Sequence, residues 1–391
     1  MTLLSRRALL CGLGAGVSNL RAQQVAAPAP EVQLPAVVPV NHRSRVSLVR
    51  GTARRKIVHD ALAAIDEDLM PALKRKKYVL IKPNLTSVVN QIASTHLDAL
   101  GGIMDYLAPR FKGPVVIAEA ASAETPVGYD NFKYGQLLSE FRPRQISLVD
   151  LNQEPRTVVA PLIDAHLRPM PIRLAARLFD PDAFILCVAI PKTHDTVVAT
   201  LAVKNMAMGA PLHSLKGETR WHDKSKIHTG IHQMNYNLLL LAQKLAPFWG
   251  ATVLDGFEGM EGNGPVSGLP VAHGIAMAST DYVAADRVGV ETMGINPKWI
   301  GYLQYCEQVG LGNYDIAKID LIGASIESVK KSYRLHRSTD RQLRWMGPLT
   351  DSPVVRLVML HLAVKTPVPV VFLVKLTGIT DRLSMAVLLI W

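Results

Sequence analysis

Short, almost uninterrupted apolar runs alternate with segments of helical periodicity through the middle of this chain. The apolar runs lie at 45–49, 78–81, 114–118, 146–149, 183–188, 251–254, 274–277 and 319–322, and helical spacing is found at 55–73, 97–107, 231–245, 282–293 and 297–308. Strands that are covered on both faces need such continuous Val, Ile and Leu runs, because neither face reaches water. The sequence therefore predicts an α/β fold with a mainly parallel sheet flanked by helices.

Composition and the pattern of apolar residues divide the 391-residue chain into four parts. Residues 1–27 have the pattern of a bacterial twin-arginine signal peptide, because adjacent arginines precede an apolar stretch that is too short to span a bilayer. An ordinary secretory signal is the alternative, and either predicts an exported, periplasmic or extracytoplasmic protein. Residues 28–44 form a Pro/Ala-rich linker, residues 45–333 the α/β domain, and residues 334–391 a basic and apolar C-terminal extension with a short helix.

The net charge of +11 favours an anionic partner. The basic residues are spread along the chain and do not interleave with aromatic side chains, so nucleic acid is not expected. An anionic small molecule and an anionic membrane surface are the remaining classes. Charged residues interrupt the apolar stretches of 334–391, so this extension is expected to pack on the main domain or to lie on a membrane surface.

Cysteine usage restricts the cofactors that this chain can hold. The three cysteines are Cys11, Cys187 and Cys306, and no Cys-x-x-Cys motif occurs. The sequence therefore predicts no cysteine-ligated iron–sulfur cluster held by this chain alone. Cys187 lies in an apolar run and is expected to be a buried, inert thiol.

Lysine and amide side chains recur next to the apolar runs. Because the carboxyl ends of parallel strands meet at one edge of a sheet, such groups can converge on an anionic ligand. The alternative is a set of turns with surface lysines. Lys216 and Arg220 would extend the same basic pocket. The predicted ligand-binding residues are Lys82, Asn84, Lys192, Lys204 and Asn205.

An acidic, glycine-rich segment, 255–265, follows the apolar run at 251–254. Glycines allow a close approach of the backbone to a ligand, so the segment is predicted to be a functional loop at the end of a strand. Asp255 and Glu261, together with His194, are the predicted catalytic groups, and Asn263 is a further ligand-binding residue. A tight loop with solvated carboxylates is the alternative.

Histidines are concentrated between 194 and 232. His228 and His232 are four residues apart, which places both rings on one face of a helix that begins early enough. Such a pair predicts a site for a divalent metal, although no glutamate follows His228 as in the zinc proteases, and a chance spacing is the alternative.

Thr280 or Asp281 is expected to cap the helix at 282–293, and the role of Asp286 stays open.

Several short motifs occur in a fixed order along residues 45–325, and together they resemble the domain-of-unknown-function family numbered 362. The resemblance implies an α/β domain found across prokaryotes, in which some members carry ferredoxin-like cluster domains and others carry twin-arginine signals, but it implies no reaction. The chain departs from the family at 117–122, where relatives tend to have a turn that contains an aspartate. The sequence leaves open whether Glu119 replaces that aspartate carboxylate. The motifs are Ile81-Lys82-Pro83-Asn84, Pro191-Lys192-Thr193-His194, Val203-Lys204-Asn205, Asp255-Gly256, Gly259-Met260-Glu261-Gly262-Asn263-Gly264-Pro265 and Thr280-Asp281 to Asp286.

These features predict an exported protein that binds or processes an anionic small molecule, with a divalent metal as a candidate cofactor. A non-catalytic carrier of a ligand or cofactor for another exported enzyme is the first alternative, and a peripheral membrane protein is the second. The first hypothesis requires the lysines, Asp255 and Glu261 to open into one cleft.

Overall fold

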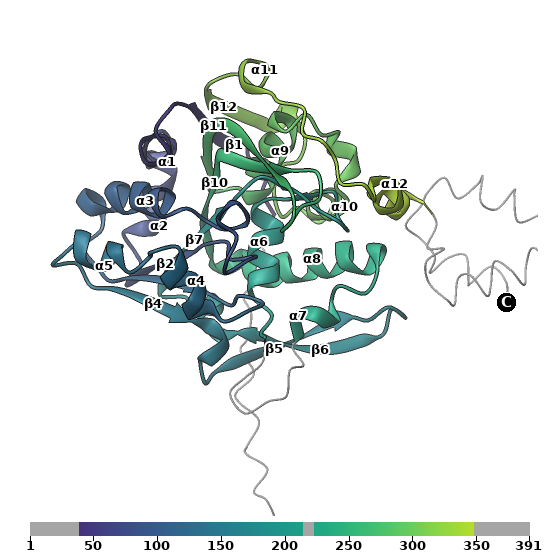
Figure 1. The fold of residues 1–391 in the computed structure, drawn as a ribbon, viewed down its shortest axis with the longest axis horizontal. Helices are drawn as coiled ribbons and strands as arrows, with labels where there is room; N and C mark the ends of the chain where they lie inside the picture. Colours follow the sequence, from purple (N-terminus) through teal and green to yellow (C-terminus); the bar gives the residue numbers. More distant parts are fainter. Residues whose placement is uncertain (1–38, 214–222, 348–391) are drawn as a thin grey trace, which may run out of the picture. The chain divides into compact units, whose positions relative to one another are not determined.

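A computed structural model of the chain describes residues 39–213 and 223–347, and the structural statements below concern these residues. The main sheet has the strand order β12-β1-β11-β10-β7-β2-β3-β4 (Figure 1). Each of the predicted strands is present in it. The strands are β1 (Ser44–Arg50), β2 (Tyr78–Lys82), β3 (Val115–Glu119), β4 (Ile146–Asp150), β7 (Ala183–Ala189), β10 (Trp249–Glu261), β11 (Leu269–Ser279) and β12 (Ile319–Gly323).

Most neighbouring strands of this sheet are parallel, as the apolar runs predict. The pairs β3–β4, β2–β3, β2–β7, β7–β10 and β1–β12 are parallel, whereas β11 is antiparallel to both β10 and β1. The connection from β10 to β11 covers only residues 262–268, which is too short for a crossover helix, so this pair has to be antiparallel.

Successive residues of the central strands point to opposite faces and enter two different cores. In β2, Val79 and Ile81 belong to one core and Leu80 to the other. Figure 1 shows the first group of helices on one side of the sheet and the second group on the other. The first group is α1 (Arg54–Ala63), α2 (Asp66–Leu73) and α3 (Leu97–Arg110), and the second is α6 (Ala202–Gly209), α8 (Ile231–Leu245), α9 (Tyr282–Thr292) and α10 (Gly301–Gln308).

The helical periodicity at 55–73 belongs to two helices, not one. α1 ends at Ala63 and α2 begins at Asp66, with Ile65 between them in a non-helical conformation. The first turn of α2 contains three consecutive acidic residues, which favour a helix N-terminus at this point. Similarly, the pattern at 297–308 starts as a separate 3-10 turn, Pro297–Trp299, before α10 begins.

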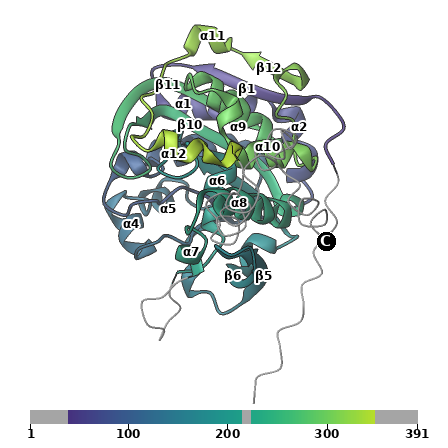
Figure 2. The same ribbon diagram turned by 90° about the vertical axis from the view of Figure 1, so that its right-hand side faces the viewer.

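The sequence did not predict a separate two-stranded sheet made of β5 (Thr157–Ile163) and β6 (Pro169–Ala175). Pro161 lies opposite Pro171 in this pair, and prolines inside a strand argue against a strand assignment. The hairpin packs against α8 (Figures 1 and 2). The other short elements are β8 (Lys192–Thr193), β9 (Ala199–Thr200), α4 (Thr125–Asn131), α5 (Gln136–Glu140), α7 (Asp223–Lys226), α11 (Ile326–Val329) and α12 (Thr339–Gln342).

The predicted loop at Asp255–Glu261 is instead the second half of β10. Asp255 pairs with Ala276 of β11, and the register shifts by a bulge before Glu258. A Cβ on Gly259 would lie 2.1 Å from the hydroxyl oxygen of Tyr333, so this glycine allows a side chain to pack against the strand. The loop itself is confined to 262–268.

Two aspartates of the 280–286 segment are helix caps. The Asp281 carboxylate accepts hydrogen bonds from the backbone N–H groups of Val283 (2.9 Å) and Ala284 (3.0 Å), which confirms the predicted cap of α9. Asp286 is fully buried and caps α6, because its carboxylate accepts from the N–H groups of Ala202 (2.7 Å) and Val203 (2.9 Å). The N-terminus of α6, which carries Lys204 and Asn205, is therefore positioned by α9.

Cys187 is buried, as expected, and burial raises the pKa of its thiol to about 12. None of the helices within 39–213 and 223–347 is long and apolar enough to cross a bilayer. The predicted signal peptide and most of the C-terminal extension, 348–391, lie outside the described residues.

Candidate functional site

A cavity of about 170 Å³ lies at the carboxyl ends of β2 and β3. Lys82 is the last residue of β2 and Glu119 the last of β3, and both line the cavity. The chain leaves β2 toward β3 on one side, and β7 later pairs with the other side of β2. Open α/β sheets bind their ligands at such a switch point, outside the carboxyl ends of the strands.

The cavity collects most of the residues that were predicted to bind a ligand. Lys82, Asn84, Lys204 and Asn205 line it, and so does the predicted catalytic residue His194. The other charged or titratable residues of its wall, within the part of the chain that the structure describes, are Glu119, Lys224, Asp195 and His228.

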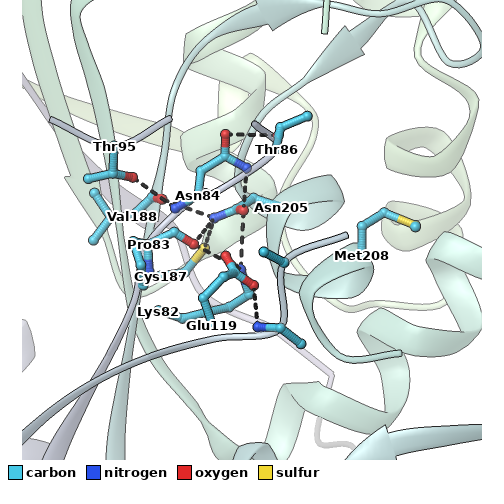
Figure 3. A network of polar contacts seen from close by, with 12 residues as sticks. Lys82, Pro83, Asn84, Thr86, Thr95, Glu119, Cys187, Val188, Asn205 and Met208 are labelled. Atoms are coloured by element: carbon cyan, nitrogen blue, oxygen red, sulfur yellow. Dashed lines mark hydrogen bonds and ion pairs between the residues drawn. The ribbon is translucent and has the colours of Figure 1, made fainter. Parts of the chain in front are cut away.

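Lys82 and Glu119 form a buried ion pair in this wall. Lys82 is fully buried, and its Nζ donates to Glu119 Oε2 (2.8 Å), to the carbonyl oxygen of Pro83 (2.9 Å) and to Asn205 Oδ1 (3.2 Å) (Figure 3). The other carboxylate oxygen, Oε1, accepts the N–H of Ala120 (2.9 Å). All three N–H groups of the ammonium are thus hydrogen-bonded, as a buried charge requires.

Two asparagines extend the network away from this pair (Figure 3). Asn205 Oδ1 also accepts from Asn84 Nδ2 (2.8 Å), and Asn205 Nδ2 donates to the carbonyl oxygen of Val188 (2.9 Å). Asn84 Oδ1 in turn accepts from Lys192 Nζ (2.6 Å). A continuous chain of side chains therefore links Glu119 to Lys192 across the ends of β3, β2 and β7.

Lys192 serves as an anchor and does not line the cavity. Its fully buried ammonium also donates to Thr86 Oγ1 (3.0 Å) and to the carbonyl oxygen of Ala93 (2.8 Å), so it ties the segment after β2 to β8. Burial lowers the pKa of Lys192 well below its usual value, and the charges of Lys204 and Lys82 add to this effect.

Lys204 differs from the other lysines of the site. It lies in the first turn of α6, is only 7% exposed and lines the cavity. Its ammonium has no hydrogen-bond or ion-pair partner among the described residues. Burial lowers the pKa of Lys204 to about 8, an effect that nearby Asp195 opposes and Lys82 reinforces.

Lys224 is a cavity residue that the sequence analysis missed. No apolar run precedes it, so the sequence has no strand-end pattern that marks this lysine. It is buried in α7, and its Nζ donates to the carbonyl oxygens of Ala120 and Met208 (2.7 Å for Met208). Burial lowers its pKa to about 7 despite the opposing charge of Glu119.

His194 is a neutral imidazole with a defined tautomer. Its Nδ1 accepts the backbone N–H of Thr196 (2.9 Å), so the ring proton resides on Nε2. Burial, followed by the charge of Lys204, lowers the pKa of His194 well below its usual value. The 3.0 Å approach of Asp195 to Nδ1 is therefore not an ion pair. Among the described residues, Nε2 has no hydrogen-bond partner, and the ring lines the cavity.

The loop that carries His194 is supported by the C-terminal part of the described chain. Ser338 donates through Oγ to the carbonyl oxygen of Asp195 (3.0 Å), and Gln342 Oε1 accepts the backbone N–H of Val198. Val198 has φ +68°, a conformation that is strained for a β-branched residue. Residues 338–342 thus help to fix the shape of the cavity rim.

Three predicted site residues lie elsewhere. Asp255 is buried beside Arg54 (3.3 Å) and lines a separate hollow of about 10 Å³. Glu261 accepts the backbone N–H of Arg334 (2.8 Å), and Asn263 is exposed in the loop after β10. The acidic groups therefore do not face the lysines, because the continuation of β10 carries them past the cavity. The single cleft of lysines, Asp255 and Glu261 that the sequence predicted is not formed, and the carboxylate beside Lys82 is that of Glu119.

The predicted metal ligands do not share a helix face. α8 begins at Ile231, so His228 precedes the helix that contains His232, and His228 Nδ1 lies 3.0 Å from the carbonyl oxygen of Lys224. Burial and then Lys204 lower the pKa of His228, although solvent reaches much of this residue and weakens the effect. In the described part of the chain, no three His, Cys, Asp or Glu residues are grouped to hold a metal. The metal site stays a prediction, and Lys216 and Arg220 lie outside the described residues.

Comparison with known proteins places the chain in a family. Residues 79–291, more than half of the chain, match the model of a domain of unknown function, DUF362. The chain belongs to the DUF362 family. The matched range of this DUF362 protein contains Lys82, Glu119, His194, Lys204 and Lys224, so the cavity is built almost entirely from the family domain.

A thylakoid-associated protein of Synechocystis sp. is 29% identical to the DUF362 protein over 140 residues. The match covers 36% of this chain and 41% of the relative, so the chain spans less than half of that relative's length. A crystal structure of a protein from Thermotoga maritima aligns with a TM-score of 0.32 and 11% identity, over 54% of this chain and 52% of the other.

Gly209, the last residue of α6, provides a test of the Lys82 network. A Cβ on Gly209 would lie 1.8 Å from Lys82 Cε and 2.3 Å from its Nζ. We expect Gly209→Ala to displace the ammonium from Glu119 and to lower the free energy of unfolding by about 2–4 kcal/mol in urea titrations.

Gly135→Ala is the matched control for this change. Gly135 has φ −56°, and a Cβ there would meet no atom within 4 Å. The control should be neutral or slightly stabilising, by up to about 1 kcal/mol. Equal stability of the two variants would contradict the proposed role of the Lys82 network.

Proposed function

We propose that this DUF362 protein binds a small anionic molecule in the cavity at the ends of β2 and β3. The observation that carries the proposal is the ammonium of Lys204, which is buried in the cavity wall without a partner among the described residues. An ammonium that is largely removed from bulk solvent and has no protein partner is stabilised by an anion in the cavity that it faces.

The other charges of the wall support an anion over a cation. Glu119 is engaged by Lys82, and Asp195 is about half exposed, whereas no carboxylate of the described residues is in hydrogen-bond contact with Lys204 or Lys224. The volume of about 170 Å³ is roughly ten times the smallest volume that holds one water molecule. A ligand with a few non-hydrogen atoms, such as a short carboxylate or an oxyanion, fits this space.

We expect Lys204→Met to weaken the binding of sulfate about tenfold to a hundredfold, because a charge-assisted contact is lost. Removal of an unpaired buried charge should leave the melting temperature unchanged or higher. Isothermal titration calorimetry and a thermal melt measure the two effects. Lys74→Met, at an exposed lysine, is the charge-matched control. If Lys204→Met binds sulfate as tightly as the control, the proposal is wrong.

The affinity for sulfate should also depend on pH. Sulfate remains a dianion between pH 6 and 9, whereas Lys224 and Lys204 have pKa values of about 7 and about 8 in the free protein. An anion binds the protonated forms, so affinity is highest below pH 7. It should fall by up to about tenfold per pH unit for each lysine above its pKa. A flat calorimetric profile from pH 6 to 9 would exclude these lysines as the binding groups.

We also propose that the protein is exported by the twin-arginine route and that its C-terminal extension contacts a membrane surface. The adjacent residues Arg6 and Arg7 support the first part, and the similarity to a thylakoid-associated protein supports a location at a membrane. Replacement of both arginines by lysine should retain the protein in the cytoplasm, as detected by fractionation. Unchanged export would favour an ordinary secretory signal.

A further inference from the structure

We infer that Lys204 is a nucleophilic amine that forms a Schiff base with the carbonyl group of a small oxo acid bound in the cavity. This inference rests on the proposed anion binding and adds to it the chemical class of the ligand. It also adds a covalent step.

The first support is the contrast between Lys204 and the neighbouring lysines. Lys82 and Lys192 each donate to three acceptors, so neither has a lone pair available for attack. Lys224 donates to two backbone carbonyl groups. Lys204 donates to none among the described residues and lines the cavity, so its nitrogen is held beside a ligand with no competing hydrogen bond. Burial beside other cations is the usual way in which proteins activate a lysine.

The second support is the division of roles that the cavity wall allows. A 2-oxo acid carries a carboxylate and an adjacent carbonyl carbon. A bound carboxylate favours the ammonium form of Lys224, whose third N–H has no partner among the described residues and is available for that carboxylate. The Nε2–H of His194 is likewise available for the carbonyl oxygen. Lys204 is then left to meet the carbonyl carbon.

The step requires no oxidant, reductant or metal. The neutral amine of Lys204 attacks the carbonyl carbon to give a carbinolamine, which loses water and leaves a C=N bond to Nζ. With a pKa of about 8, about a tenth of Lys204 is neutral at pH 7. The protonated fraction attracts the anion and the neutral fraction reacts. The modification of Lys204 by the oxo acid should therefore become faster from pH 6 to pH 8, while the affinity for sulfate falls.

Glyoxylate with sodium cyanoborohydride is the direct test, because the hydride reduces the imine to a stable carboxymethyl-lysine. The full-length protein is treated at pH 7.5, digested with a protease that does not cut at lysine, and mapped by mass spectrometry. We expect Lys204 to be modified at least tenfold faster than the exposed Lys74, and sulfate to protect Lys204 but not Lys74. Equal rates at the two lysines would overturn the inference.

Lys204→Arg separates this inference from the proposed function. The variant has no primary amine at position 204, so fast modification should disappear from every peptide, whereas sulfate binding is measured on the wild-type protein. If wild-type protein binds sulfate and Lys204 is not captured faster than Lys74, the covalent step is wrong and anion binding stands. If sulfate is not bound and does not protect Lys204, the proposed function fails first.

Discussion

Lys82 and Glu119 form an ion pair at the carboxyl ends of β2 and β3, where almost no water reaches either group. A buried pair of this kind is stable only if its remaining hydrogen-bonding atoms are also satisfied. Pro83, Ala120 and Asn205 supply those partners, so the ion pair joins two strands to the first turn of α6. The close approach of Gly209 to Lys82 and the relay through Asn84 to Lys192 both follow from this arrangement.

The fold could be predicted from the sequence because burial on two faces leaves a direct pattern of apolar residues. Eight of the ten strands that the described residues contribute to the main sheet follow that pattern, whereas the β5–β6 pair, with its opposed prolines, does not. The glycines after Asp255 indicated a loop, yet they lie in β10, where Gly259 makes room for Tyr333. A glycine pattern alone does not distinguish backbone freedom from close packing.

The candidate site was predictable in part for a similar reason. Polar groups next to the apolar runs were expected to meet at one edge of a parallel sheet, and Lys82, at the end of β2, and Lys204, in α6, both line the cavity. The sequence did not distinguish their roles, because the role of a buried lysine depends on its hydrogen-bond partners. The sequence left open whether Glu119, at the end of β3, replaces a carboxylate of the family, and Lys224 gave no usable signal because it lies in the short helix α7.

The contacts from Ser338 and Gln342 to the His194 loop place part of the cavity's support near the end of the described chain. The shortest polypeptide with an intact rim is therefore longer than the residues matched by the DUF362 model, which end at 291. A fragment cut after β12 would retain every strand of the main sheet and lose the two hydrogen bonds that hold Asp195 and Val198. Family boundaries drawn from sequence similarity thus underestimate how much of this protein is needed to shape its pocket.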